Sequence, residues 1–166
     1  MLLEINPINP PQRKIDQVVD LLRRGGVIAY PTDTIYGIGC DIMNKKAIER
    51  IYQIKQIPRS SPFSFICSDL KNISQYAKVS NYAYKTMRRL LPGPYTFVLE
   101  GSREVPKMML TPRKTAGIRV GSNCIEYGLD NLVCVTLDTE VGSFLHLTCV
   151  YLVDWHSCSP FVVWFD

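Results

Sequence analysis

The 166-residue sequence predicts an α/β fold, because helical and extended patterns alternate along its first 120 residues. Apolar residues recur at helical spacing in several segments, and short apolar runs of strand length separate these segments. Hydrophobic residues make up 46% of the chain and charged residues 20%, which is ordinary for a globular protein and too polar for a membrane-spanning one. A chain of this length can bury one core, so we expect a single domain.

The helices are predicted from apolar periodicity between capping and breaking residues. Their expected extents are from Pro10-Pro11 to the stop at Gly25-Gly26, from the cap Asn44 to the break at Pro58, a short helix that starts at Asp69, and from the cap Ser80 through Leu91. The predicted strands between and after them are residues 27–30, 63–67, 95–99 and 115–120.

The pattern changes near Gly121. All 19 Lys and Arg lie between Arg13 and Arg119, and with nine acidic residues they give residues 1–120 a net charge of +10. The last 46 residues contain six acidic residues, no Lys or Arg, and both tryptophans. They also contain three β-rich apolar runs, at 132–137, 144–153 and 161–165, with no helical pattern.

The cysteines predict buried, reduced thiols and no metal site. The sequence has no Cys-x-x-Cys pair among Cys40, Cys67, Cys124, Cys134, Cys149 and Cys158. Free cysteine packs as a small hydrophobe, and His146 and His156 lack neighbouring ligands. No run of about 18 apolar residues and no secretory leader pattern is present, so we expect a cytoplasmic protein.

The first candidate binding segment is the end of the first predicted strand, residues 30–39, which read YPTDTIYGIG. Hydroxyls and a carboxylate follow the strand, and glycines allow a ligand to approach the backbone. Ligands favour the carboxyl ends of strands in open α/β sheets. A capped tight turn, in which Asp33 and Thr34 bond their own backbone, explains the same residues equally well.

The second candidate segment, residues 55–62, reads KQIPRSSP and joins a predicted helix to a strand. Two cations and two hydroxyls in a proline-stiffened loop suit phosphoryl oxygens, and could stabilise charge on an α-phosphate. A solvated basic loop is the alternative.

Two further candidate segments lie around the later strands. Residues 92–97, PGPYTF, form a turn that feeds a strand, and Arg119 lies in the apolar strand 115–120. A guanidinium is costly to bury, so Arg119 either meets an anion or points outward from an edge strand. The scattered basic residues would form a nucleic-acid footprint if several shared a face, with a solvated surface as the alternative.

Together, four segments in this order resemble the YrdC/YciO family: 25–37 (GGVIAYPTDTIYG), 55–62, 92–97 and 118–120 (IRV). Residues 6–13 and 63–65 look closer to the YciO branch. The resemblance extends to about residue 120. It implies a YrdC/RibB-like twisted open sheet with helices packed on it and a concave basic face.

The resemblance also implies an activity, the formation of threonylcarbamoyl-AMP from L-threonine, bicarbonate and ATP for tRNA modification. By position, Thr34 and Arg119 would contact L-threonine, and Lys55, Ser61 and Thr96 would contact ATP. Magnesium would accompany the triphosphate. The mechanism would rest on positioning and charge neutralisation.

The sequence departs from the family pattern in two places. The family's Lys-x-Arg pair is Lys55-Gln56-Ile57 here, and Arg59 comes two residues later. After Val120 the family's Ser-x-Ser-Ala-Asn-like segment is missing. We therefore expect residues 1–120 to be a YrdC-like domain, and 121–166 to be a divergent or replaced C-terminal segment, as from a frameshift or alternative splicing, that completes or is appended to it.

Three interpretations follow from these observations. The first is a threonylcarbamoyl-AMP synthase-like enzyme, either active or impaired. The second is a non-catalytic YciO-like protein that binds double-stranded RNA or tRNA through its basic face. The third is an incompletely folded product with an aggregation-prone tail.

Overall fold

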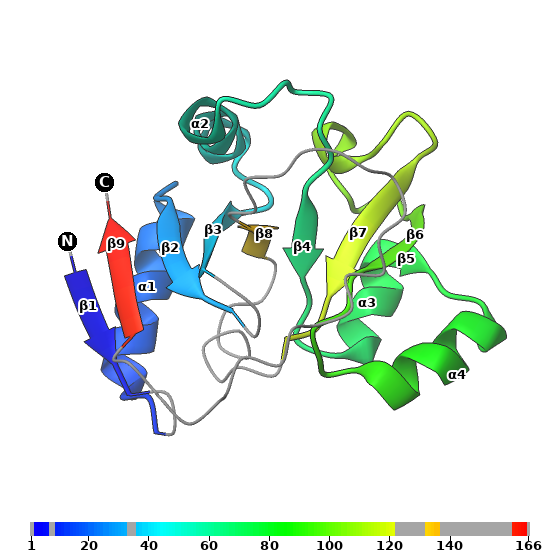
Figure 1. Ribbon diagram of the computed structural model, residues 1–166, viewed down its shortest axis with the longest axis horizontal. Coiled ribbons are helices and arrows are strands. Elements are labelled where there is room, and N and C mark those ends of the chain that lie inside the picture. Colours follow the sequence, from blue (N-terminus) through cyan, green and yellow to red (C-terminus); the bar gives the residue numbers. More distant parts are fainter. Residues whose placement is uncertain (1, 7–8, 33–35, 122–131, 137–160, 166) are drawn as a thin grey trace.

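The computed structural model describes residues 2–6, 9–32, 36–121, 132–136 and 161–165, which form a mixed sheet with helices packed against it (Figure 1). The strands are β1 (Leu2–Ile5), β2 (Ile28–Pro31), β3 (Tyr36–Asp41), β4 (Ser64–Ile66), β5 (Ala77–Lys78), β6 (Phe97–Gly101), β7 (Thr115–Arg119), β8 (Leu132–Thr136) and β9 (Phe161–Phe165). Their order in the sheet is β1-β9-β2-β3-β8-β4-β7-β6-β5. Among these neighbours, only β4 and β7 pair in parallel.

The helices begin at the predicted caps. They are α1 (Gln12–Arg23), α2 (Lys45–Lys55), α3 (Leu70–Tyr76) and α4 (Asn81–Leu90), with a 3-10 turn, η1 (Lys107–Met109). The side chains of Asn44, Asp69 and Ser80 accept hydrogen bonds from the backbone N–H three residues later, at 3.1, 2.6 and 3.2 Å. Each bond satisfies a donor that the first helical turn leaves open. None of the described helices has the length and apolar character needed to cross a bilayer.

Most predicted strands are present, and three further strands were not predicted. β4 and β7 lie within their predicted ranges, β2 ends one residue beyond its range, at Pro31, and β6 starts two residues later than predicted, at Phe97, and ends at Gly101. β1, β3 and β5 were missed. β3 was interpreted as part of a polar loop, but its glycines pair with β2 in the register Ile28↔Gly39 and Tyr30↔Gly37.

The chain beyond Gly121 contributes two strands to the sheet. β8 and β9 coincide with two of the predicted apolar runs, and the run at 144–153 lies outside the described residues. β8 pairs with β3 and β4, and β9 pairs with β1 and β2, all antiparallel. The division of the chain at residue 120 stays a prediction.

The core has one layer on each face of the sheet. Alternate strand residues point to opposite faces, so Ile28 joins the layer under α1 while Val27 joins the layer under α2 to α4. The larger layer includes Ile51 of α2, Phe65 of β4 and Ile118 of β7. Over β4, β7 and β6, the face opposite this larger layer carries the residues described below.

Two isoleucines of α2 provide a test of this packing. Ile51 is 0% exposed in the core and Ile54 is 47% exposed on the same helix. We expect Ile51→Ala to lower the free energy of unfolding by about 2–5 kcal/mol, because it leaves a cavity. Ile54→Ala should cost about 0.5 kcal/mol or less. Urea unfolding of both variants measures the difference, and equal losses would contradict the assigned faces of α2.

Candidate functional site

The loop between α2 and β4 is turned by its first residues. Gln56 ends α2 in the left-handed conformation with φ 52°, and the N–H of Ile57 donates to the carbonyl of Tyr52 at 3.4 Å. Ile57 is half-buried and packs against the core. Arg59 and Ser60, which follow it, are exposed. The position that the family pattern gives to an arginine therefore faces inward, and the cation of this loop lies two residues later.

Tyr52 fixes the second half of the same loop. Its hydroxyl donates to the carbonyl oxygen of Ser61 at 2.9 Å, and the N–H of Ser61 donates to the carbonyl of Pro58 at 2.9 Å. The ring of Tyr52 stacks on Phe63 with 4.1 Å between centroids and 23° between planes. Residues 58–61 thus form a closed turn that is anchored on α2.

A second loop, between η1 and β7, faces the first. The N–H of Thr111 donates to the carbonyl of Thr115 at 2.9 Å, and the two hydroxyl oxygens lie 2.7 Å apart. The N–H of Lys114 donates to the carbonyl of Thr111 at 2.8 Å, with Lys114 at a φ of 58°. These bonds close a tight turn, so Thr111 has a fixed place next to the start of β7.

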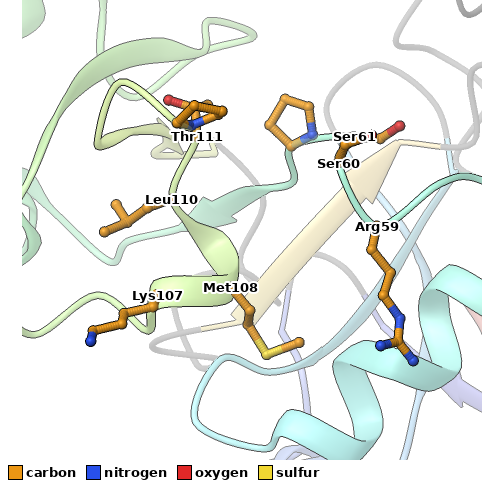
Figure 2. Close-up of a pocket in the computed structure, with 9 residues that line it drawn as sticks. Arg59, Ser60, Ser61, Lys107, Met108, Leu110 and Thr111 are labelled. Atoms are coloured by element: carbon orange, nitrogen blue, oxygen red, sulfur yellow. The ribbon is translucent and has the colours of Figure 1, made fainter.

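The two loops enclose a hollow of about 330 Å³. Figure 2 shows Arg59, Ser60 and Ser61 on one side of it, and Lys107, Met108, Leu110 and Thr111 on the other. Pro62 and Pro112 complete the lining. The loops lie side by side because they precede β4 and β7, which are parallel neighbours.

The lining of the hollow has the chemistry of an anion site. It contains two cations, Arg59 and Lys107, and three hydroxyl groups, those of Ser60, Ser61 and Thr111, with no carboxylate among the nine lining residues. Arg59 lies 3.9 Å from Glu49, but its side chain is 76% exposed, so this ion pair is worth little and leaves the guanidinium available. Such donors suit phosphoryl oxygens.

The same lining does not fit a directly bound magnesium ion. Magnesium requires oxygen ligands and is usually held by carboxylates together with substrate phosphates. None of the nine lining residues offers a carboxylate. Magnesium at this hollow would therefore be held by the oxygens of a bound polyphosphate.

A second group of polar residues lies on the face of the sheet opposite the larger core layer. Arg119 ends β7, which lies between β4 and β6, and its side chain is only 6% exposed. The alternative that Arg119 points outward from an edge strand is therefore wrong. Extending the register Phe97↔Ile118 by one residue places Thr96 opposite Arg119, on the face of the sheet that Ile66 also occupies.

Two hydroxyl residues approach each other closely over Gly117 on this face. A Cβ atom on Gly117 would lie 3.2 Å from the Cβ of Ser64 and 3.3 Å from the Cγ2 of Thr96. Both distances are shorter than ordinary van der Waals contacts. Position 117 therefore has no room for a larger side chain, and glycine allows Ser64, three residues after Ser61, to pack close to Thr96.

The structure separates the predicted site residues into two groups. Ser61 lines the hollow, whereas Thr96 and Arg119 lie at the far end of β7. The four residue steps from the start of β7 at Thr115 to Arg119 span about 13 Å, at about 3.3 Å per residue. Lys55 is half-buried at the end of α2 and is not among the lining residues of the hollow. Thr34 lies outside the described residues.

The sequence reasoning missed the second wall of the hollow. Lys107 and Thr111 were not nominated, because the segment between Pro106 and Pro112 reads only as a turn. The available signal was the parallel pairing of the two strands that follow these loops, which brings the loops together. That pairing was not predicted.

The described cysteines pack in the core. Cys40 and Cys67 are buried and form no disulfide bond, as predicted. Burial, and then the nearby carboxylate of Asp41, raises the pKa of Cys40 to about 12, so its thiol stays protonated at neutral pH.

Known proteins resemble this chain in both sequence and structure. The Sua5/YciO/YrdC family model, described as telomere recombination, matches residues 20–137. The uncharacterized protein YciO of Escherichia coli strain K12 is 48% identical over 126 residues, which cover 75% of this chain and 61% of the relative. A threonylcarbamoyl-AMP synthase of Vibrio vulnificus strain YJ016 is 34% identical over 123 residues, covering 69% of this chain and 66% of the relative.

The structural comparison agrees. The crystal structure of E. coli YciO matches with a TM-score of 0.76 and 45% identity, covering 80% of this chain and 68% of the other. Sua5 of P. abyssi, crystallised with L-threonine, matches with a TM-score of 0.72 and 25% identity, covering 77% of this chain and 39% of the Sua5 chain. This chain spans about three fifths of the YciO relative, 61%. With a YrdC-type fold and a family match that continues past Val120 to residue 137, the chain belongs to the Sua5/YciO/YrdC family.

Proposed function

We propose that this protein binds ATP and forms threonylcarbamoyl-AMP from L-threonine and bicarbonate, in the cytoplasm and in the service of tRNA modification. The observation that carries the proposal is the hollow between the two loops, in which Ser61 lies beside Arg59 and opposite Lys107 and no lining residue is a carboxylate. The V. vulnificus relative is a threonylcarbamoyl-AMP synthase, and the P. abyssi neighbour binds L-threonine. These two relatives support ATP and L-threonine as the substrates.

The hollow suits the phosphate chain of ATP better than its base. Its lining has cations and hydroxyls but no aromatic side chain on which adenine could stack. Its volume of about 330 Å³ is at the lower limit of ligand pockets. In the proposed complex the phosphates occupy the hollow, and the rest of the substrates extends along β4 toward Thr96 and Arg119.

The proposed chemistry needs positioning and charge neutralisation. The amine of L-threonine and bicarbonate give a carbamate and water, and a carbamate oxygen then attacks the α-phosphorus of ATP while pyrophosphate leaves with the bonding electron pair. Arg59 and Lys107 would balance the charge on the departing phosphates. Arg119, buried beside Thr96, would provide the positive charge for the threonine carboxylate.

Substrate binding tests the proposal directly. Isothermal titration of the cooperatively folded chain with ATP and magnesium should show binding that tightens when threonine and bicarbonate are present. Pyrophosphate release and the threonylcarbamoyl-AMP product, detected by mass spectrometry, would confirm turnover. If the folded protein bound no ATP under these conditions, the proposed function would be wrong.

Variants of the hollow test where the phosphates bind. Arg59→Ala should weaken ATP binding about tenfold, because it removes a charge-assisted hydrogen bond. Lys107→Ala should weaken it less, because the ammonium is directed away from Arg59 (Figure 2). Arg13→Ala, on the exposed face of α1, is the matched loss of a cation and should bind ATP as the wild type does. Equal binding by Arg59→Ala and Arg13→Ala would place the phosphates elsewhere.

A second candidate function is RNA binding, and it rests on α4. This helix carries Lys85, Arg88 and Arg89 without an acidic residue, and its Tyr82 and Tyr84 are 82% and 46% exposed. Cations bind phosphates, and exposed aromatic rings can stack on unpaired bases.

RNA binding has its own test. The wild type should bind tRNA with an affinity that falls steeply with salt, because binding releases counterions. A variant with alanine at all three cations of α4 should bind tRNA more weakly and show a shallower salt dependence. An unchanged salt dependence in that variant would exclude α4 as the RNA-binding surface.

A further inference from the structure

We propose that Tyr52 is a positioning residue for the anion hollow, and that its hydroxyl holds Arg59 and Ser61 in their binding geometry. The inference rests on the proposed function for the identity of the ligand. It assigns to a buried helix residue, which does not line the hollow, a role in binding through the loop that does.

Tyr52 contacts the loop at three places along its length. Its backbone carbonyl accepts from the N–H of Ile57 at the beginning of the loop, and its hydroxyl donates to the carbonyl of Ser61 near the end. Its ring stacks on Phe63, immediately before β4. The segment between these contacts carries Arg59, so the loop is folded around one side chain of α2.

The hydroxyl is the contact through which the loop can be loosened without disturbing the core. The ring is 5% exposed within the larger core layer, and phenylalanine would keep both its burial and its stacking. The hydroxyl bond instead fixes the carbonyl of Ser61, and the N–H of Ser61 closes the turn by donating to the carbonyl of Pro58. Burial raises the pKa of Tyr52, which keeps the hydroxyl protonated and able to donate at neutral pH.

A double-mutant cycle distinguishes positioning from general stability. Tyr52→Phe should weaken binding of ATP about fivefold, and of inorganic tripolyphosphate similarly, while the protein still melts cooperatively. If the hydroxyl acts by placing Arg59, the same change in an Arg59→Ala background should have a clearly smaller effect. Ser74→Ala removes an exposed hydroxyl on α3 that bonds the carbonyl of Lys71 and not the loop, and this variant should bind both ligands as the wild type does.

Each result decides the inference. Unchanged ATP affinity in Tyr52→Phe would overturn it, and so would losses that simply multiply in the double variant. If the folded wild type bound neither ATP nor tripolyphosphate, the proposed function would fail, and amide exchange at residues 59–61 would decide the positioning role alone. Faster exchange at Ser61 in Tyr52→Phe would then support that role, and unchanged exchange would refute it.

Discussion

The parallel pairing of β4 with β7 is the constraint on which both parts of the site depend. The register Ser64↔Gly117 and Ile66↔Arg119 aligns the ends of the two strands, and β7 begins only two residues before the position opposite the start of β4. Because parallel strands run in the same direction, the loops that precede them meet at one edge of the sheet. The hollow forms at that edge, and β6, on the other side of β7, places Thr96 opposite Arg119.

The electrostatics of the hollow follow from the end of α2 beside it. The carbonyl groups at the C-terminus of a helix carry partial negative charge, which disfavours a nearby anion. Lys55, in the last turn of α2, offsets part of this charge, and Gln56 turns the chain away from the helix axis. Anion binding in the hollow must therefore depend on side chains from both loops. In the proposed complex, hydroxyls would orient the ligand and the cations would supply most of the attraction.

The sequence predicted the elements whose signals are local. Asn44, Asp69 and Ser80 begin helices because their side chains bond the nearby backbone, and this can be recognised from a few residues. β3 was missed because its pairing with β2 and β8, rather than its own glycine-containing sequence, makes it a strand. For the same reason Ser61 was predicted as a binding residue while Lys107 was not, since Lys107 joins the site only through the pairing of β4 with β7.

The displaced cation of the loop shows why spacing in the sequence is an incomplete guide to this site. Position 57 would be expected to carry an arginine, but the left-handed turn at Gln56 and the bond from Ile57 to Tyr52 direct that position toward the core. An apolar side chain is stabilised there, whereas a guanidinium would have to be desolvated. Arg59 lies beyond the turn, in the part of the loop that lines the hollow. The position of the positive charge is thus set by how the loop is held on α2, so that Tyr52 and the placement of Arg59 belong to one structural arrangement.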